Sequence, residues 1–208
     1  MRVPQRSLEL TQVTEWNDGK IRLLDDYLAA EEPLEIRIVS KPILVTMRTP
    51  GHDKELTAGF LWTEGLIDSP RQLGALHQMG GEAGGKSNVV DVELCDTSFD
   101  PEIMRRNFFA ASSCGICGKA SINEVRVRGL RPPDANFTVD SEMLCTLPER
   151  LRAEQQVFGR TGGLHAAGLF DAQGEMLVLR EDIGRHNALD KVVGWALLEA
   201  CCRCRSTY

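Results

Sequence analysis

The chain has 208 residues, is 42% hydrophobic and 26% charged, and carries a net charge of −6 at pH 7. This length and composition predict a soluble protein of one large domain or two small ones, and the negative charge argues against nonspecific nucleic-acid binding. No apolar run approaches the length of a membrane span, and the N-terminus lacks the apolar core of a secretory signal. We therefore expect a cytoplasmic protein without a membrane partner.

The first third of the chain predicts a strand pair followed by a helix. Residues 1–30 are polar and weakly patterned, so no element is predicted there. Two short runs rich in β-branched residues, 34–39 and 43–48, predict two paired strands. The apolar spacing over 52–67 predicts a helix, which residues 68–70 should break.

The glycine-rich segment GGEAGGKS, residues 80–87, fits the letters of a phosphate-binding loop. Such a loop needs a buried strand before it and a helix after it, so that backbone amides converge on phosphate. Residues 73–79 do not form a convincing strand pattern, whereas residues 88–95 predict a strand. The context therefore argues against nucleotide binding and favours a hairpin or connecting loop.

The middle of the chain is less regular. We expect a short helix near Cys117 and a strand over 125–129. A further helix is predicted to begin at Thr146, with Pro148 in its first turn, and to end at Gly159.

The clearest elements lie near the end of the chain. Segments 165–170 and 175–180 predict a hairpin, and 184–202 predicts a long helix. The residues of this helix expected to be buried share one face: Leu189, Val192, Val193, Ala196, Leu197 and Ala200. We expect two domains, an N-terminal α+β lobe (1–104) and a C-terminal α/β domain (105–208).

A pair of cysteines, Cys114 and Cys117, has C-x-x-C spacing, with Gly115 and Ile116 between them and Gly118 after them. Small neighbours on a loop leave both sulfurs accessible, and the amides of a helix start lower a thiol pKa. Such a thiolate is suited to attack on another sulfur. The spacing leaves disulfide exchange and sulfur carriage open, while zinc, which wants four ligands, is disfavoured because no second C-x-x-C pair lies at a sensible spacing from the first.

The chain has seven cysteines, an odd count for a disulfide framework, so we expect free thiols in a reducing compartment. Cys95 and Cys145 have apolar neighbours and are expected to be small core residues. No function is assigned to the three cysteines of the last eight residues: Cys201, Cys202 and Cys204.

The segment around Gly162 and Gly163 is a second candidate for chemistry. Two glycines allow the backbone to approach a ligand closely, and His165 follows them. A lone histidine is more often a hydrogen-bonded structural residue. Its position beside the two glycines and close to Arg160 strengthens the functional interpretation.

The third candidate is a predicted junction between a strand and a helix that contains Asp182, Gly184, Arg185, His186 and Asn187. Free amides at a helix start favour an anion, and arginine can bind a phosphate through two hydrogen bonds. The alternative is that Asp182 or Asn187 only caps the helix. Capping explains one of the five residues, so we favour a ligand that carries phosphate.

Together these segments resemble the FdhD family of formate dehydrogenase accessory sulfurtransferases, over roughly residues 30–200. The segments that carry the resemblance are RTPG (48–51), GFLWTEGLI (59–67), SSCGICGKASI (112–122), GGLHAAGLF (162–170) and DIGRHNALDKVVG (182–194). The resemblance implies a cytoplasmic sulfur carrier that accepts a persulfide sulfur from a cysteine desulfurase. The carrier would deliver this sulfur to the molybdenum or tungsten of a bis(pterin guanine dinucleotide) cofactor needed by formate dehydrogenase.

The resemblance further implies a homodimer and a C-terminal domain like cytidine deaminase, a three-layer α/β/α fold. Cys114 matches the cysteine of the family that forms the persulfide, and Cys117 matches its partner. The last residues, CCRCRSTY, differ from the family, whose members continue beyond the long helix, so we expect a truncated C-terminus.

Three other functions were weighed. A thiol–disulfide oxidoreductase would use the same C-x-x-C pair, but the residues before it do not match the strand of a thioredoxin motif. A zinc deaminase needs a glutamate in H-x-E ahead of its cysteines, whereas His165 follows the cysteines and precedes Ala166 and Ala167. A chaperone that binds the cofactor without catalysis would not need the Cys114 thiol.

Overall fold

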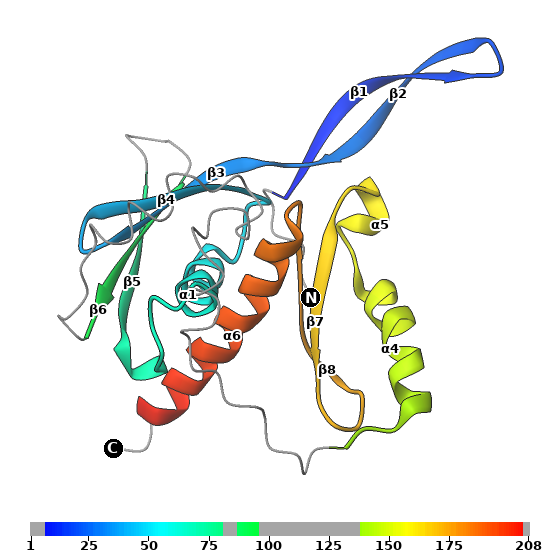
Figure 1. Ribbon diagram of the computed structural model, residues 1–208. Helices are drawn as coiled ribbons and strands as arrows, with labels where there is room; N and C mark the ends of the chain where they lie inside the picture. The colour runs from blue at the N-terminus through cyan, green and yellow to red at the C-terminus, as the bar shows by residue number, and fades with distance from the viewer. Residues whose placement is uncertain (1–6, 81–86, 96–137, 206–208) are drawn as a thin grey trace, which may run out of the picture.

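The computed structural model describes residues 7–80, 87–95 and 138–205. Its first element is a hairpin of β1 (Leu8–Asn17) and β2 (Lys20–Ala29), which extends away from the rest of the molecule (Figure 1). The prediction of no element over residues 1–30 was therefore wrong. Asp18 and Gly19 both have positive φ, 48° and 77°, and form the two-residue turn. An Asp-Gly pair is a strong hairpin signal, and it was overlooked because apolar residues lie on both faces of these strands and leave no clear alternation.

A four-stranded sheet contains β3 (Glu32–Ile38), β4 (Lys41–Arg48), β5 (Leu73–Met79) and β6 (Val89–Leu94), in the order β4-β3-β6-β5. The strand pair predicted over 34–39 and 43–48 is confirmed as β3 and β4. Strand β3 runs parallel to β6, and β5 runs antiparallel to β6.

Strand β5 corrects the prediction that residues 73–79 do not form a strand. The register shifts between Leu73 and Leu76, so the two leucines that face the core lie three positions apart and the alternation is broken. The glycine-rich segment joins antiparallel β5 to β6, and a strand rather than a helix follows it. The strand that follows agrees with the argument against a nucleotide-binding loop, whereas residues 81–86 of the segment lie outside the described residues, so the connecting loop stays a prediction.

Two helices, α1 (Asp53–Thr63) and α6 (Arg185–Arg205), lie side by side between the four-stranded sheet and a second hairpin (Figure 1). They approach closely through glycines. A Cβ at Gly59 would lie 1.8 Å from the Asp190 carbonyl oxygen, and one at Gly194 would lie 1.8 Å from the Glu55 carbonyl oxygen. Any side chain larger than hydrogen at either position would force the two helices apart.

The main core lies between the sheet and these helices. It contains Leu34, Ile36, Ile38, Ile43, Leu56, Ala58, Phe60, Leu61, Leu66, Ile67, Leu73, Val90, Val92 and Leu197. Helix α6 therefore shares a core with the N-terminal strands. The boundary at residue 104 lies outside the described residues, so the division into 1–104 and 105–208 stays a prediction.

The long helix predicted over 184–202 is confirmed as α6, but its buried face was partly wrong. Val192 and Leu197 are buried, whereas Leu189 is 51% exposed and Ala200 is also exposed. Ala188, Lys191, Val192 and Gly194 are buried instead. The buried stripe is turned because α6 packs against α1 on one side and the second hairpin on the other.

The second hairpin, β7 (His165–Phe170) and β8 (Met176–Asp182), confirms the prediction over 165–170 and 175–180. Helix α4 (Ser141–Glu154) packs against it. This helix begins at Ser141, not at Thr146, because the Asp140 side chain caps it by accepting the Glu142 amide at 3.0 Å. Pro148 lies inside it.

Two short helices complete the described elements, α5 (Phe158–Thr161) and the 3₁₀ helix η1 (Pro70–Gln72). Helix α5 is separate from α4 and ends at Gly162 with φ 66°, so the predicted end at Gly159 was wrong. The predicted helix near Cys117 and the strand over 125–129 lie outside the described residues.

The expectation that Cys95 and Cys145 are core residues was also wrong, because both are exposed. Cys95 follows the last residue of β6, and Cys145 lies on α4, which buries none of its residues. The mixed α/β class is confirmed. Within the described ranges, no helix is long and apolar enough to cross a membrane.

Candidate functional site

The structure brings two of the predicted motifs together at one end of the second hairpin. His165, the first residue of β7, pairs with Asp182, the last residue of β8. Gly162 and Gly163 immediately precede β7, and α6 begins at Arg185. The predicted junction between a strand and a helix is therefore confirmed as the end of β8 and the start of α6.

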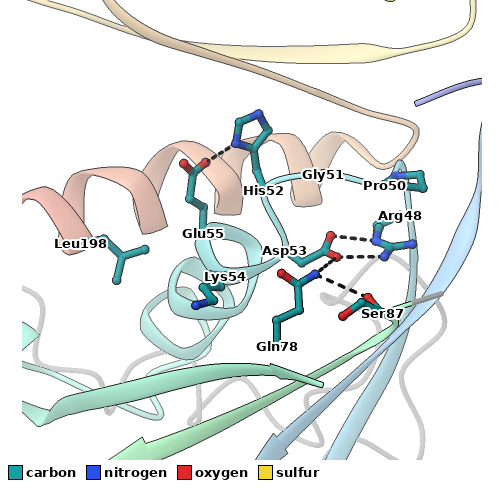
Figure 2. A pocket seen from close by; sticks show the side chains of 10 residues that line it. All are labelled: Arg48, Pro50, Gly51, His52, Asp53, Lys54, Glu55, Gln78, Ser87 and Leu198. Carbon is teal, nitrogen blue, oxygen red and sulfur yellow. Dashed lines mark hydrogen bonds and ion pairs between the residues drawn. The ribbon is translucent and has the colours of Figure 1, made fainter. Parts of the chain in front are cut away.

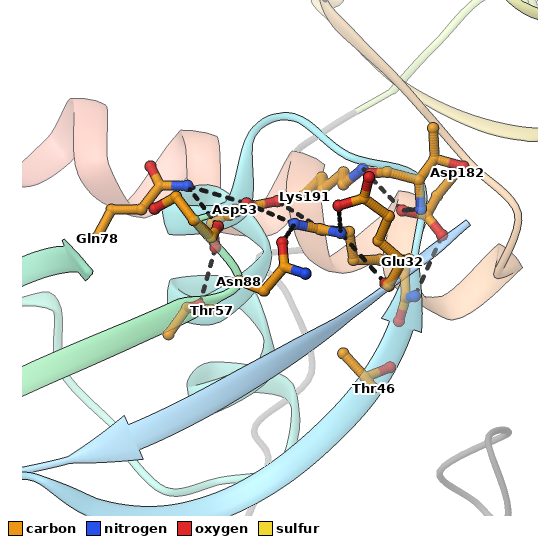
Figure 3. Close-up of polar contacts among 12 residues, drawn as sticks. Glu32, Thr46, Asp53, Thr57, Gln78, Asn88, Asp182 and Lys191 are labelled. Atoms are coloured by element: carbon orange, nitrogen blue, oxygen red, sulfur yellow. Dashed lines mark hydrogen bonds and ion pairs between the residues drawn. The ribbon is translucent and has the colours of Figure 1, made fainter. Parts of the chain in front are cut away.

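Asp182 is the centre of this junction and is fully buried. Its Oδ1 accepts the Gly184 amide at 2.8 Å and the Asn187 side-chain amide at 3.1 Å. Its Oδ2 accepts the Thr49 amide at 3.1 Å and lies 2.7 Å from Lys191 Nζ. Figure 3 shows Asp182 and Lys191 within this group of polar contacts. The carboxylate binds three segments of the protein to one another.

Lys191 is a buried cation with a side chain that is only 1% exposed. Its Nζ donates to the carbonyl oxygen of Thr49 at 2.9 Å and to that of Glu181 at 3.3 Å. Burial lowers the pKa of Lys191 below its ordinary value, and the neighbouring Asp182 carboxylate opposes part of that shift. Together with Asp182, this residue completes a buried ion pair whose polar atoms have hydrogen-bond partners.

The RTPG segment is held against the junction by further hydrogen bonds. The Ile183 amide donates to Thr49 Oγ1 at 3.1 Å, and the Asn187 side chain donates to the Met47 carbonyl at 2.8 Å. The analysis of the sequence did not single out Thr49 or Lys191. Both lie inside motifs that carried the family resemblance, and this was the signal that could have found them.

A second buried ion pair holds Arg48, the first residue of the same segment. Arg48 Nε lies 2.9 Å from Asp53 Oδ1, and Arg48 Nη2 lies 3.0 Å from Asp53 Oδ2. The Arg48 guanidinium also donates to the Glu32 carbonyl at 3.2 Å, and Gln78 donates to Asp53 at 3.0 Å (Figure 3). This pair holds the first residue of α1 against Arg48, the last residue of β4.

An open pocket of about 640 Å³ lies where α1 begins (Figure 2). His52 precedes the helix in the left-handed backbone conformation, with φ 60°, and its Nδ1 lies 3.4 Å from Glu55 Oε2. The pocket is lined by Arg48, Pro50, Gly51, His52, Asp53, Lys54, Glu55, Gln78, Ser87 and Leu198.

Glu55 in this pocket is fixed by two partners. Arg180 Nη2 donates to Glu55 Oε1 at 2.8 Å, and Arg180 Nε donates to Oε2. Burial alone would raise the pKa of Glu55, but the hydrogen bonds from Arg180 and His52 outweigh burial and hold it below its ordinary value. Glu55 therefore remains a carboxylate. It orients the His52 ring so that Nδ1 faces the carboxylate.

The predicted residues differ in their access to a ligand. Gly162, Gly163, His165 and Arg185 are exposed, and His186 is half-buried, whereas Asp182 is enclosed. The exposed groups form a rim beside the N-terminus of α6, where free amides and a guanidinium favour an anion. The capping alternative also has support, because Asp182 accepts the Gly184 amide. Binding of a cofactor by these residues stays a prediction.

Cys114 and Cys117 lie outside the described residues, so their position relative to the rim is not described. Across the described ranges, no cluster of three or more histidine, cysteine or acidic residues is arranged to hold a metal ion.

Comparisons with known proteins extend over most of the chain. The FdhD/NarQ family model matches residues 29–204. A protein of Streptomyces coelicolor named sulfur carrier protein FdhD is 48% identical over 202 residues, which cover 94% of this chain and 71% of that protein. Proteins with the same name are 49% identical in Mycobacterium tuberculosis, over 81% of this chain and 64% of theirs, and 42% identical in Thermoplasma volcanium, over 84% and 64%.

A solved structure has the same fold. It is a formate dehydrogenase accessory protein of Desulfotalea psychrophila, and it superposes with a TM-score of 0.68 at 21% identity, covering 93% of this chain and 70% of its own. At this identity the likeness concerns the fold alone. The family match and the identity of the relatives together show that the chain belongs to the FdhD/NarQ family.

Proposed function

We propose that this protein is a sulfur carrier that serves the maturation of formate dehydrogenase. The observation that carries the proposal is the family match over residues 29–204, which includes Cys114, Cys117 and the strand–helix junction. The names of the relatives, sulfur carrier protein FdhD, support the same role. The proposed localisation of the protein is the cytoplasm.

In the proposed loading step, the Cys114 thiolate attacks the outer sulfur of a persulfide on a cysteine desulfurase. A new S–S bond forms at Cys114 as the donor's S–S bond breaks, and the donor cysteine leaves as a thiolate. No net oxidation occurs, because one persulfide replaces another. Cys117 lies three residues away and is the partner thiol of this loop.

In the proposed delivery step, the terminal sulfur passes to the molybdenum or tungsten of a bis(pterin guanine dinucleotide) cofactor. The reduced metal gives two electrons to the sulfur, which binds as sulfide, and Cys114 returns as a thiolate. The cofactor is the substrate here. Its phosphates suit the rim formed by Gly162, Gly163, His165 and the start of α6.

The junction gives this proposal a physical basis on the protein side. Asp182 and Lys191 are buried and paired, so they fix the backbone from Gly184 to Asn187 without being available to the ligand themselves. Arg185 is exposed and His186 is half-buried, and both would contact the phosphates directly. The proposed assembly is a homodimer that meets its sulfur donor and formate dehydrogenase in turn.

Complementation tests the proposal in cells that lack their own carrier of this family. We expect the wild-type chain to restore formate dehydrogenase activity and the Cys114→Ala variant to restore none. The effect of Cys117→Ala should be equal to that of Cys114→Ala or milder. A chaperone that only binds the cofactor would keep its activity in Cys114→Ala. Equal activity of this variant and the wild type would therefore refute sulfur carriage. A longer relative expressed in parallel serves as the positive control, because the match to the Streptomyces coelicolor protein covers 71% of that protein.

A further inference from the structure

Asp190 is a buried carboxyl group at the contact between α6 and α1, and it is not part of the rim. Only 8% of its surface is exposed. The two helices lie side by side (Figure 1), and a Cβ on Gly59 would lie 1.8 Å from the Asp190 carbonyl oxygen. Backbones this close leave little room between the helices for water or a counter-ion.

The charges around Asp190 disfavour its ionised form. Helix α6 packs against α1, β7, β8 and η1. From the described parts of these elements, the charged groups that act on the Asp190 carboxyl are Glu64, which caps the end of α1, and Asp182 at the end of β8. Both are acidic, and Lys191, the next residue of α6, is bound to Asp182. Within the described ranges, no ion pair holds Asp190 as a carboxylate.

Burial acts in the same direction as these charges. Burial and the two neighbouring carboxylates raise the pKa of Asp190 to about 7, and the hydrogen bond with Thr63 opposes part of the shift. Both protonation states of Asp190 are therefore populated near neutral pH.

The Thr63 hydroxyl has two oxygen atoms within reach. Its Oγ1 lies 2.9 Å from Asp190 Oδ1 and 3.4 Å from the Phe60 carbonyl oxygen in the last turn of α1. A hydroxyl donates one proton and can also accept one. A protonated Asp190 can donate to Oγ1 while Oγ1 donates to the Phe60 carbonyl. An ionised Asp190 can only accept, so the hydroxyl must turn to it and its bond to Phe60 is lost.

The ionised state is also unfavourable for the end of α1. The last carbonyl groups of a helix carry a partial negative charge, so an anion placed beside them is destabilising. Helix α1 ends at Thr63, whose hydroxyl contacts Asp190, and the cap that follows is Glu64. Loss of the Asp190 proton should therefore weaken the last turn of α1.

We propose that Asp190 and Thr63 form a proton-sensitive contact through which α6 holds the last turn of α1. The protonated carboxyl closes a hydrogen-bond chain from Asp190 through Thr63 to Phe60. When the proton passes to solvent, the hydroxyl turns to the carboxylate and the last turn loosens. Asp190 follows Arg185 in the same helix, so pH sets how firmly the helix that carries the rim is held against α1. This inference does not depend on sulfur carriage.

NMR of protein labelled with ¹³C at the aspartate carboxyl carbons tests the titration. An aspartate carboxyl carbon of the wild type should titrate near pH 7, and Asp190→Asn should remove that signal. Thr63→Val should move the midpoint to higher pH, because the hydroxyl no longer stabilises the carboxylate. Glu64→Gln should move the midpoint to lower pH, because a neighbouring negative charge is removed.

Thr146→Val is the matched control for the loss of the hydroxyl. Thr146 Oγ1 donates to the Met143 carbonyl oxygen at 2.8 Å, three residues earlier in α4, just as Thr63 is placed relative to Phe60. Among the described residues the Thr146 hydroxyl has no carboxyl partner. The Asp190 midpoint should therefore be the same in Thr146→Val as in the wild type.

Hydrogen exchange tests the loosening itself. Amide exchange over residues 60–64, relative to the intrinsic rate at each pH, should rise at least about threefold from about pH 6 to about pH 8 in the wild type and stay level in Asp190→Asn. If Asp190→Asn fails to fold, the wild-type exchange profile and the shifts in the two neighbouring variants decide. The proposal is overturned if no aspartate carboxyl titrates near pH 7, if Thr63→Val and Glu64→Gln shift the midpoint in the same direction, or if wild-type exchange does not rise.

Discussion

Replacing Lys191 by methionine should destabilise the fold by about 3–5 kcal/mol, because it leaves a buried carboxylate without its cation. The Asp182 side chain is fully buried, and Lys191 Nζ lies 2.7 Å from its Oδ2. The same substitution removes the hydrogen bond to the Thr49 carbonyl at 2.9 Å. Methionine keeps most of the side-chain volume, so loss of packing contributes little.

The pair can be separated from its surroundings by a double-mutant cycle. Asp182→Asn alone leaves Lys191 buried with one fewer anionic partner and should also cost a few kcal/mol. In the variant that carries both changes no buried charge is unpaired, so we expect it to be more stable than the sum of the single effects by about 2 kcal/mol or more. Urea unfolding of the four proteins, followed by circular dichroism, measures each free energy. A cost below about 1 kcal/mol for Lys191→Met, or additive single effects, would refute the assignment of a buried ion pair at this junction.

Three further predictions follow from the packing, the buried acid and the exposed rim. Gly194→Ala should lower the free energy of unfolding by at least about 1–3 kcal/mol, because its Cβ would lie 1.8 Å from a carbonyl oxygen of α1. Gly159→Ala is the matched control, because no atom lies within 4 Å of the new Cβ. Equal thermal unfolding of the two variants would contradict the close contact between the helices. Burial raises the pKa of Asp190 from 3.8 to about 7, so the folded state keeps a proton that the unfolded state loses between these values. The contribution of Asp190 to stability therefore declines by up to about 4 kcal/mol as pH rises through that range, and Asp190→Asn should remove this part of the pH dependence of urea unfolding, whereas an unchanged pH profile would exclude the shift. Arg185→Gln should weaken the binding of guanosine diphosphate about tenfold, as measured by titration calorimetry of this protein. An unchanged affinity would show that Arg185 does not contact the phosphates.

The elements with regular patterns were predicted from the sequence. The two runs over 165–170 and 175–180, joined by the turn residues DAQG, indicated the β7–β8 hairpin, and the helical spacing over 184–202 indicated α6. Strand β5 was missed, since a register shift between Leu73 and Leu76 breaks its alternation. The first hairpin was missed because neither of its strands has a buried face to impose a clear pattern.

The candidate site was predicted as a location rather than as a set of contacts. The motif around Asp182 indicated the junction, but its partner Thr49 lies 133 residues away in the sequence, and no local pattern reports such a contact. The exposed face of α6 was misjudged at Leu189 for a related reason, because the two surfaces against which the helix packs decide which side is buried.

The central claim, that the thiol of Cys114 carries a sulfur atom, is tested most directly by the mass of the intact protein. Incubation with a cysteine desulfurase and cysteine should add the mass of one sulfur atom to the wild-type chain, and treatment with a thiol reductant should remove it. The Cys114→Ala variant should gain no such mass while unfolding at the same urea concentration as the wild type. Sulfur addition that persists in Cys114→Ala, or a wild-type chain that forms only an internal disulfide, would contradict the account.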